Sequence, residues 1–255
     1  MKSWFLKCLF VVSLLLAFVV VSAQPLLVGH RGSFWGVENT EEAFVNGALK
    51  GYHLLECDVK VTADGVIVVA HDNTTNRLGG ALKVGESTLA ELQAESYVQT
   101  RGDVQYRGRI CTLAEYLDIC RQYGVRPLIE LKWANGINSN DQSGIRALMA
   151  LIEEKGFRDE CVILTSMKPC LEYIRTNYPD VELQLLAWKY SRKNLRWCKH
   201  WMIDVDIHCS GVNRRVVRKY HKAGLKVNTW TINSDSAYEK YAQMGCDFIT
   251  TDKLF

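Results

Sequence analysis

Nine short runs of apolar and β-branched residues recur along the chain, and stretches with helical periodicity separate most of them. The runs are PLLVGH, HLLECDVKVT, GVIVVAH, RPLIELK, CVILTS, ELQLLAW, WMIDVDIH, KVNTWTI and DFITTD. Strands that alternate with helices indicate a mostly parallel sheet, because each parallel connection must cross back over the sheet. This alternation limits the possible folds more than any other feature of the sequence.

The second and third runs are an exception, because only Asp64-Gly65 separates them. A parallel crossover needs about a dozen residues, so these two strands form an antiparallel hairpin. Eight parallel strands remain, and the chain has the size of a single (β/α)8 TIM barrel, typically about 250 residues. An open doubly wound sheet is the alternative, but no Gly-rich phosphate fingerprint follows the first strand. We therefore expect an α/β TIM barrel with a hairpin extension after strand 2.

The hairpin also predicts which side chains share a face. With Asp64 and Gly65 as a two-residue loop, the register of the strands places Asp58 opposite His71. Glu56 lies on the face of Asp58, because side chains alternate along a strand. A bulge near Gly65 would shift this pairing by one residue.

Residues 1–23 have the pattern of a secretory signal peptide. Two lysines flank the start of an apolar run over residues 8–21, and a small-residue cleavage motif ends at Ala23. An uncleaved anchor is the alternative, but the apolar run is short for a spanning helix. We expect export to the periplasm or the extracellular space, and a mature chain of residues 24–255 without a stable membrane span.

The composition of the mature chain excludes some classes of partner. The formal net charge of +3 falls to +1 when Lys2 and Lys7 leave with the signal peptide. So small a charge gives no general attraction to nucleic acid. The eight cysteines beyond Cys8 form no CxxC pair and no zinc-like cluster, and their spacing assigns no disulfide.

Acidic residues gather at the expected carboxyl ends of two strands, where TIM barrels carry their active sites. Glu56 and Asp58 end the second run, and Glu130 ends PLIELKW. Three inward carboxylates repel one another unless a positive group lies among them. An all-oxygen set of ligands favours one divalent cation, Mg²⁺ or Ca²⁺. A structural ion-pair network with Arg31 and Lys132 is the alternative.

His30 and His71 each close an apolar run beside a charged residue. Two histidines across a metal allow one to take a proton and the other to give one. Arg31 and Lys132 supply fixed positive charge suited to phosphate oxygens. A metal, two cations and an acid–base pair together indicate a site that cleaves a phosphate ester.

Seven motifs, in order along residues 26–252, resemble the glycerophosphodiester phosphodiesterase family. They are GHRG, ENTEEAF, LLECDVKVTADGVIVVAHDNTTNRL, TLAEYL, IELK, VNTWTIN and ITTD. The resemblance implies a TIM barrel that hydrolyses a small-molecule glycerophosphodiester to glycerol 3-phosphate and an alcohol. The main departure is Val37, which stands where the family often has proline.

The resemblance also implies a role for each site residue. It implies catalysis by His30 and His71, metal ligation by Glu56, Asp58 and Glu130, substrate binding by Arg31, Lys132 and Trp230, support by Glu38 and Asn39, and a small insertion at about residues 73–110. From the residues alone, Asn39 or Thr40 could instead cap the first helix, and for Thr40 this is at least as good an explanation. Phe34 and Trp35, with Trp230, suggest an apolar lining beside the metal.

The sequence leaves two other functions open. A lysophospholipase D or a sphingomyelinase-D-like enzyme would use a closely similar site on a lipid that keeps its tail. A catalytically inactive ligand-binding barrel is less favoured, because it should have lost a histidine or an acid of the metal set, and this chain keeps all five.

Overall fold

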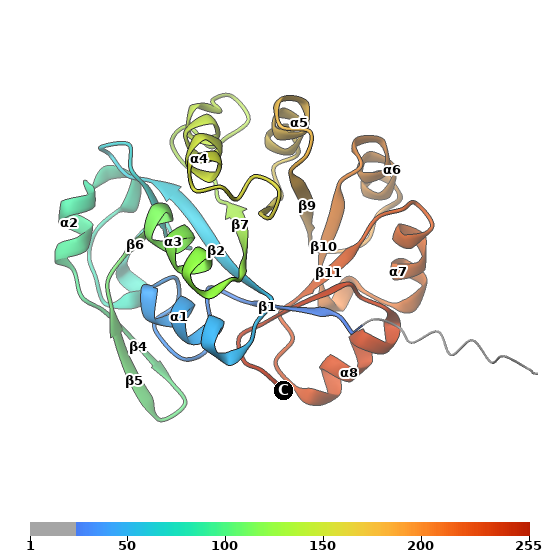
Figure 1. The fold of residues 1–255 in the computed structure, drawn as a ribbon, viewed down its shortest axis with the longest axis horizontal. Helices are drawn as coiled ribbons and strands as arrows, with labels where there is room; N and C mark the ends of the chain where they lie inside the picture. The colour runs from blue at the N-terminus through green and yellow to red at the C-terminus, as the bar shows by residue number, and fades with distance from the viewer. Residues whose placement is uncertain (1–23) are drawn as a thin grey trace, which may run out of the picture.

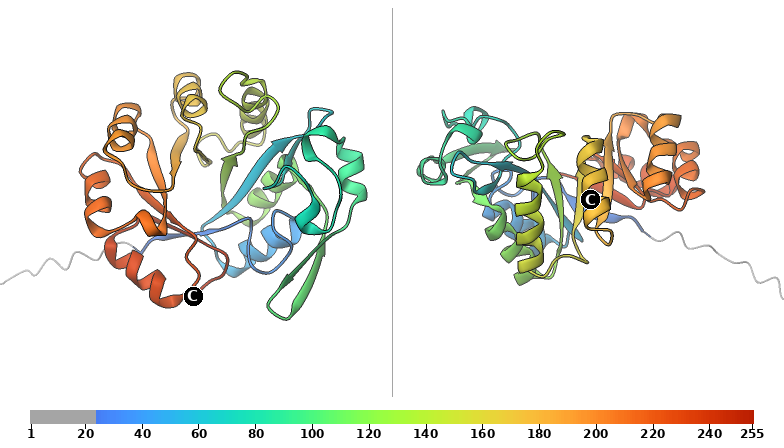
Figure 2. Two further views of the ribbon diagram at one scale, coloured as in Figure 1. Left: turned by 180° about the vertical axis from the view of Figure 1, so that it is seen from behind. Right: turned by 90° about the horizontal axis from the view of Figure 1, so that it is seen from above.

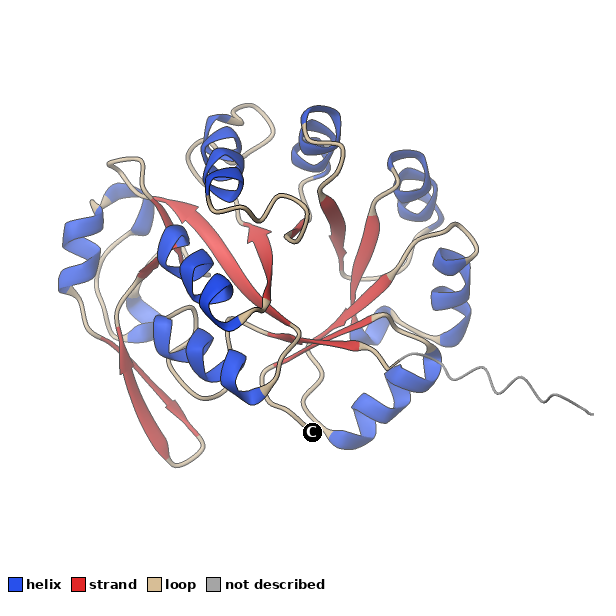
Figure 3. Ribbon diagram, in the orientation of Figure 1, coloured by secondary structure: helices blue, strands red, loops and turns tan. Residues whose placement is uncertain are grey.

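Eight parallel strands form a closed barrel in the computed structural model, which describes residues 24–255; the expected signal peptide lies outside them. Each strand pairs with the next one along the barrel, and the last strand, β12, pairs with the first, β1. This closure confirms the predicted TIM barrel (Figure 3). The strands are β1 (Leu26–Gly29), β2 (Leu54–Val61), β7 (Arg126–Leu131), β8 (Val162–Thr165), β9 (Glu182–Ala187), β10 (Asp204–His208), β11 (Val227–Trp230) and β12 (Phe248–Thr251).

Seven helices connect these strands around the outside of the barrel (Figure 1 and Figure 2). They are α1 (Glu41–Lys50), α3 (Leu113–Tyr123), α4 (Ser143–Glu154), α5 (Lys168–Asn177), α6 (Arg192–Trp201), α7 (Arg214–His221) and α8 (Asp235–Met244). Among residues 24–255, no helix is both long and apolar enough to cross a membrane.

The alternation of side chains along each strand divides the core into two parts. Odd-numbered strand residues such as Leu55, Ile129 and Ile207 belong to the large cluster that also contains buried residues of the helices. Even-numbered residues fill the interior of the barrel. The buried members of this interior cluster are Val28, Leu54, Leu128, Val162, Leu164 and Phe248.

Tyr116 of α3 holds together the two strands that carry the acidic residues. Thr112 and Glu115 begin α3 with a capping box, in which each side chain bonds the backbone of the other residue. One turn later, the Tyr116 hydroxyl donates to the Leu55 carbonyl at 2.6 Å and accepts from the Leu128 N–H at 3.2 Å. These bonds fix β2 beside β7 just below the mouth of the barrel.

The hairpin forms between β2 and β3 (Ile67–Val69), but its predicted register is wrong by one residue. The Ala70 N–H donates to the Asp58 carbonyl at 2.8 Å, so Asp58 faces Ala70 and not His71. The loop has three residues, 63–65, and ends at Gly65 with a φ of 82°. This left-handed glycine adds one residue to the turn, as in a hairpin with a bulge. His71 still reaches the mouth, because β3 ends before it.

The segment between β3 and β6 (Cys111–Thr112) includes the expected insertion and lies to one side of the barrel (Figure 1). Its base is closed by antiparallel pairing of β6 with β3. Its elements are η1 (Asn76–Leu78), η2 (Val84–Glu86), α2 (Leu89–Ala94), β4 (Tyr97–Arg101) and β5 (Val104–Gly108). A small core of its own, which also takes up Val37, includes Val68, Val84, Leu92, Tyr97 and Ile110.

Candidate active site

A cavity of about 100 Å³ opens at the carboxyl ends of the barrel strands. All eight barrel strands contribute to it, directly or through the residues that follow them. It contains both predicted catalytic histidines, both predicted phosphate-binding cations and two of the three predicted metal ligands. Its lining is His30, Arg31, Glu56, His71, Glu130, Lys132, Leu164, Leu186, Asp206, Trp230 and Thr250.

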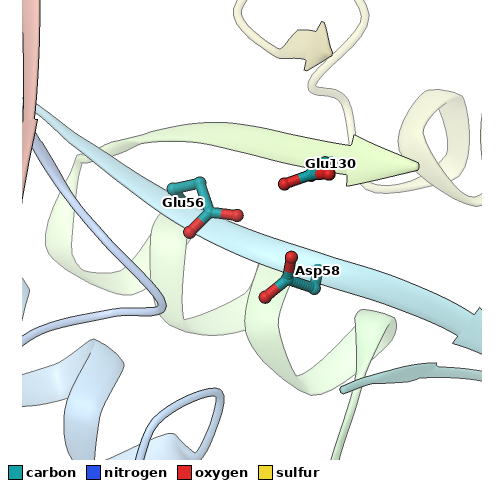
Figure 4. Close-up of side chains that lie close together, drawn as sticks. All are labelled: Glu56, Asp58 and Glu130. Carbon is teal, nitrogen blue, oxygen red and sulfur yellow. The ribbon is translucent and has the colours of Figure 1, made fainter. Parts of the chain in front are cut away.

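The three predicted metal ligands lie together at this mouth (Figure 4). Glu56, Asp58 and Glu130 each offer one oxygen, and these oxygens lie within 4.8 Å of one another. The strand pairing explains this, because Asp58 of β2 is the register partner of Glu130 of β7. Glu56 Oε1 is buried and has no hydrogen-bond partner among the described residues. An orphaned carboxylate oxygen facing two other acids fits the ligand set of a hard divalent cation.

The pKa values of the three acids diverge, because each has different neighbours. Burial, together with Asp58 and Glu130, raises the pKa of Glu56 well above its ordinary value. Burial and Asp58 also raise the pKa of Glu130 to about 7. Burial alone would raise the pKa of Asp58 too, but Lys132 and Arg31 hold it well below its usual range. Without a cation, two of the three ligands therefore resist ionisation.

Arg31 and Lys132 contact the acids and also line the cavity. Lys132 Nζ lies 2.7 Å from Glu130 Oε1 and 3.1 Å from Asp58 Oδ1. The Arg31 backbone N–H donates to Glu56 Oε2 at 2.7 Å. The side-chain Nε of Arg31 lies 3.5 Å from Asp58 Oδ2. Part of the alternative ion-pair network is thus present. It leaves Glu56 Oε1 unpaired, so these two cations do not satisfy the acidic cluster.

Each of the two histidines is held by a carboxylate of its own. His30 Nδ1 lies 2.8 Å from Asp252 Oδ1, and His71 Nδ1 lies 2.7 Å from Asp72 Oδ1. Within residues 24–255, neither Nε2 has a carboxylate oxygen within 4.0 Å. Burial lowers the pKa of His71, although Asp58 and Asp72 oppose this. A carboxylate on Nδ1 fixes the ring and leaves Nε2 for proton exchange.

Sequence reasoning gave no role to Asp252 or Asp72. Both lie within motifs already singled out, ITTD and the long motif that contains VVAHD, and Asp252 follows the carboxyl end of β12. Their positions beside strand ends were the available signal, because the other charged residues of the mouth also lie near, or just after, the carboxyl end of a strand. Asn233 Nδ2 donates to Asp252 Oδ2 at 2.5 Å, so Asp252 is itself held in place.

Glu38 lies at the centre of another ionic cluster, which Arg31 links to the acidic cluster of Glu56, Asp58 and Glu130. It accepts two hydrogen bonds from Arg77, at 2.7 and 2.5 Å, one from Arg31 at 2.8 Å and one from Gln99 at 3.1 Å. Burial alone would raise the pKa of Glu38, but Arg77 and Arg31 hold it at about 2. Arg77 also bonds Asp72 at 2.7 Å, so the cluster reaches the partner of His71. Sequence reasoning gave no role to Arg77, although it lies in the quoted motif that ends in NTTNRL, or to Gln99; both belong to the insertion.

Asn39 contacts Asp58, a predicted metal ligand, and its side chain does not cap the first helix. Its Nδ2 donates to Asp58 Oδ2 at 2.9 Å, and its Oδ1 accepts from the Asp58 N–H at 3.3 Å. No side chain caps α1, and the Thr40 hydroxyl donates to the Val37 carbonyl instead. Asn39 is thus in a position to orient the Asp58 carboxylate.

Trp230 lines the cavity, with an aromatic group beside it. The Trp188 ring stacks on His208 at a centroid distance of 4.4 Å, and both rings meet Trp230 edge to face. Phe34 and Trp35, suggested as further lining, do not line this cavity. Trp35 packs against the core outside the barrel, and Lys50 lies over its ring.

Asp206 is a buried acid of the mouth that sequence reasoning missed, because WMIDVDIH reads as an apolar run. It is 3% exposed, it lines the cavity, and its Oδ1 has no partner among the described residues. Burial, with a contribution from Glu130, raises the pKa of Asp206 well above its ordinary value. Burial therefore favours the neutral form of the carboxyl group, and this form can donate one hydrogen bond.

Known proteins resemble this chain over most of its length. The model of the glycerophosphoryl diester phosphodiesterase family matches residues 29–254. A glycerophosphodiester phosphodiesterase of Caldanaerobacter subterraneus is 27% identical over 239 residues, 90% of this chain and 94% of that protein. One of Bacillus altitudinis is 26% identical over 235 residues, 88% of this chain and 91% of that protein.

A solved structure adds a bound molecule to the comparison. A phosphodiesterase of Oleispira antarctica, in complex with the product sn-glycerol-3-phosphate, superimposes with a TM-score of 0.81 at 25% identity. The match covers 90% of this chain and 93% of that one.

Proposed function

The chain belongs to the glycerophosphoryl diester phosphodiesterase family and is an enzyme of that family, and we propose that it hydrolyses glycerophosphodiesters with one divalent cation and two histidines. The products are glycerol 3-phosphate and an alcohol. The observation that carries the proposal is the cluster of Glu56, Asp58 and Glu130, with its orphaned oxygen, in a mouth that also holds His30 and His71.

Glu56, Asp58 and Glu130 are proposed to hold Mg²⁺ or Ca²⁺. When bound, the cation supplies positive charge that polarises the phosphoester and favours loss of a proton from a hydroxyl beside it. Arg31 and Lys132 bind the remaining phosphate oxygens, since both line the cavity and both already contact carboxylate oxygens there. Trp230 forms the apolar wall of the pocket.

The nucleophile is proposed to be the glycerol hydroxyl next to the phosphate. Such a hydroxyl is already within reach of phosphorus, so the step is unimolecular. One histidine takes its proton, the new P–O bond closes a cyclic phosphate, and the other histidine protonates the departing alcohol. Water then opens the cycle with the two roles reversed. Asp252 and Asp72 support this chemistry by holding Nδ1 of each ring.

Activity is tested with purified protein and a panel of glycerophosphodiesters and lysolipids, with and without chelator. We expect release of glycerol 3-phosphate, its loss on chelation and its return with Mg²⁺ or Ca²⁺. His30→Ala and His71→Ala should each lower turnover by roughly a hundredfold or more. Full turnover in excess chelator would contradict the metal assignment, and exclusive cleavage of lysolipids would favour the lysophospholipase D alternative.

An analogue that lacks the glycerol hydroxyl next to the phosphoester separates the two possible nucleophiles. We expect it to bind and to resist cleavage, because no internal hydroxyl can attack. Rapid cleavage of the analogue would show that water attacks the phosphorus directly.

We also propose that the enzyme is exported to the periplasm or the extracellular space, on the pattern of residues 1–23. Cell fractionation with mass spectrometry of the mature N-terminus is the test. We expect a chain that begins at Gln24 outside the cytoplasm, and a cytoplasmic full-length chain would refute the proposal.

A further inference from the structure

A second cavity, of about 460 Å³, lies beside the active site. We propose that this Lys60 cavity binds the alcohol part of the substrate and selects alcohols that carry an anionic group, in the first place a phosphomonoester. The inference rests on the proposed function and names its substrate class. The lining is Lys60, Val61, Asn73, Thr74, Lys83, Gly85, Glu86, Trp133, Ala134 and Asn135.

The active-site cavity is too small for a whole glycerophosphodiester. Pockets that bury ligands of this kind measure roughly 300–1,000 Å³, whereas the active-site cavity measures about 100 Å³. It has room for the phosphate and little more, so the two ends of the substrate must extend beyond it. The Lys60 cavity falls within the usual size range of a ligand site.

Three chain segments lead from the active site directly into the Lys60 cavity. Lys60 lies on the same face of β2 as Asp58, two residues farther along. Trp133 follows Lys132 at the end of β7, and Asn73 comes two residues after His71. The cavity is therefore on the His71 side of the mouth. An alcohol protonated by His71 as it departs would lie at the entrance to this cavity.

The opposite side of the mouth suits the glycerol part of the substrate. His30 follows β1 and Trp230 ends β11, and each of these strands pairs with β12. A histidine on that side can take the proton of the glycerol hydroxyl, while His71 gives a proton to the alcohol. The glycerol part, which all these substrates share, and the alcohol part, which varies, then occupy different cavities.

Lys60 is a buried cation without a counter-ion of its own. It is 5% exposed, and its Nζ donates to Asn73 Oδ1 at 2.7 Å. In the part of the chain that the structure describes, no carboxylate oxygen lies within 4.0 Å of this Nζ. The nearby acids are already paired, Asp58 with Lys132 and Asp72 with His71. A buried ammonium that uses one of three donors is suited to bind an anion.

The other lining groups fit a hydroxylated ring better than a quaternary ammonium. Trp133 is 65% exposed and offers an apolar face, and Asn73 and Asn135 offer amides to hydroxyl groups. Lys83 and Glu86 pair with each other at 3.0 Å and add no net charge. Lys60 repels a cationic alcohol such as choline. A phosphorylated polyol matches the positive charge, the amides and the indole face together.

A purely structural role for Lys60 makes a different prediction. Through Asn73, Lys60 could serve only to hold the loop that carries His71. Its removal would then lower the turnover of every substrate by the same factor. A role in binding the alcohol lowers turnover selectively, for substrates with an anionic alcohol.

The test compares glycerophosphoinositol 4-phosphate with glycerophosphoinositol, which differ only by one phosphate. In the wild type we expect a higher kcat/KM for the phosphorylated substrate. Lys60→Met should lower the ratio of the two kcat/KM values by about tenfold or more, as for loss of a charge-assisted hydrogen bond. Lys60→Arg should restore part of the ratio. Lys222→Met is the control, because Lys222 is an exposed lysine that caps the carboxyl end of α7.

Binding of inositol 4-phosphate, measured by calorimetry against unphosphorylated inositol, gives a readout that does not need turnover. We expect the wild type to bind the phosphorylated alcohol more tightly and Lys60→Met to lose this preference. An unchanged preference, or an equal loss for both substrates, overturns the inference while hydrolysis itself stands. If no glycerophosphodiester is hydrolysed at all, the proposed function fails, and the binding result still decides whether the Lys60 cavity holds an anion.

Discussion

His30 and Asp252 form a pair that the proposed mechanism requires to act as one unit. Asp252 Oδ1 lies 2.8 Å from Nδ1 of the ring, and the two residues are 222 positions apart in the chain. If the Asp252 carboxylate serves only to orient the imidazole, it contributes nothing to turnover once the imidazole is removed. The pair can therefore be tested by a double-mutant cycle.

We expect Asp252→Asn to lower kcat by about tenfold or more, and His30→Ala to lower it further. In the His30→Ala background, Asp252→Asn should not lower kcat any further. Steady-state kinetics on one glycerophosphodiester gives the four values, with the exposed Asp103→Asn as control. Two losses that simply multiply would mean that Asp252 acts independently of His30.

Glu56 decides whether the acidic cluster is a cation site or only an ion-pair network. Its buried Oε1 has no hydrogen-bond partner among residues 24–255, so the ionised carboxylate destabilises the fold when no cation is bound. In chelator, we expect the Glu56→Gln variant to have the same Tm as the wild type or a higher one. It should also lose most of the stabilisation that Mg²⁺ or Ca²⁺ gives the wild type, about 2.7 kcal/mol at a concentration 100 times Kd.

Thermal melts with and without cation measure both effects, and Glu86→Gln, an exposed substitution away from the cluster, is the control. An unchanged shift of Tm by the cation in Glu56→Gln would contradict the site. A large loss of stability in chelator would instead support the ion-pair network.

At the scale of elements, Glu38 ties the loop after β1 to the insertion. Its partners are Arg31 from that loop and Arg77 and Gln99 from the insertion. These ion pairs hold the pKa of Glu38 at about 2 in the folded protein, against an ordinary value of 4.5. The stabilisation is therefore complete above about pH 4.5 and disappears as the pH falls towards 2.

We expect Glu38→Gln to lower the free energy of unfolding by about 3 kcal/mol at pH 7, because two arginines lose their buried partner. The difference from the wild type should shrink as the pH falls from about 4.5 to 2. Denaturant unfolding at several pH values measures it, with the exposed Glu239→Gln of α8 compared in parallel. A difference that is the same at pH 3 and pH 7 would show that the charge of Glu38 is not the cause.

Taken as a whole molecule, the barrel has a charged half and an apolar half at its mouth. The strands β12, β1, β2 and β7 lead to most of the charged residues, whereas β8, β9 and β11 contribute apolar groups and β10 contributes the buried acid Asp206. The charged half consists of Asp252, His30, Arg31, Glu56, Asp58, His71, Glu130 and Lys132, and the other half of Leu164, Leu186, Trp230 and Asp206. The predicted metal-binding and phosphate-binding residues thus lie in one half of the mouth, and a largely apolar wall lies in the other.

The cysteines are another property of the whole molecule, because all eight in residues 24–255 are free thiols. Seven are buried, and only Cys209 is partly exposed. Burial raises the pKa of thiols such as those of Cys57 and Cys120, which keeps them protonated and unreactive.

We expect about one thiol per native chain to react rapidly with a thiol reagent, and eight to react after unfolding. A ninth would report that Cys8 has been retained with an uncleaved leader. Spectrophotometric titration of native and denatured protein gives both counts. Fewer than eight reactive thiols in the denatured chain would indicate disulfides and contradict the assignment.

The pattern of apolar runs and the lengths of their connections were enough to predict the barrel and the meeting of strand-end residues at its mouth. Alternating runs required a parallel sheet, and the short Asp64-Gly65 link removed one strand from the count. Because the carboxyl ends of parallel strands share one rim, residues as far apart as His30, Glu130 and Trp230 had to meet there. These inferences depend only on local periodicity and connection length, which a sequence displays directly.

The register of the hairpin and the partner of each charged group became clear only in the folded protein. One left-handed residue, Gly65, moved the pairing of Asp58 by one position, and Asp-Gly fits both kinds of turn. The contacts of Asp252 with His30 and of Arg77 with Glu38 join segments whose approach depends on packing over the whole barrel and on loop paths. Such contacts leave no periodic trace in the chain, because they depend on where folded segments meet and not on how residues follow one another.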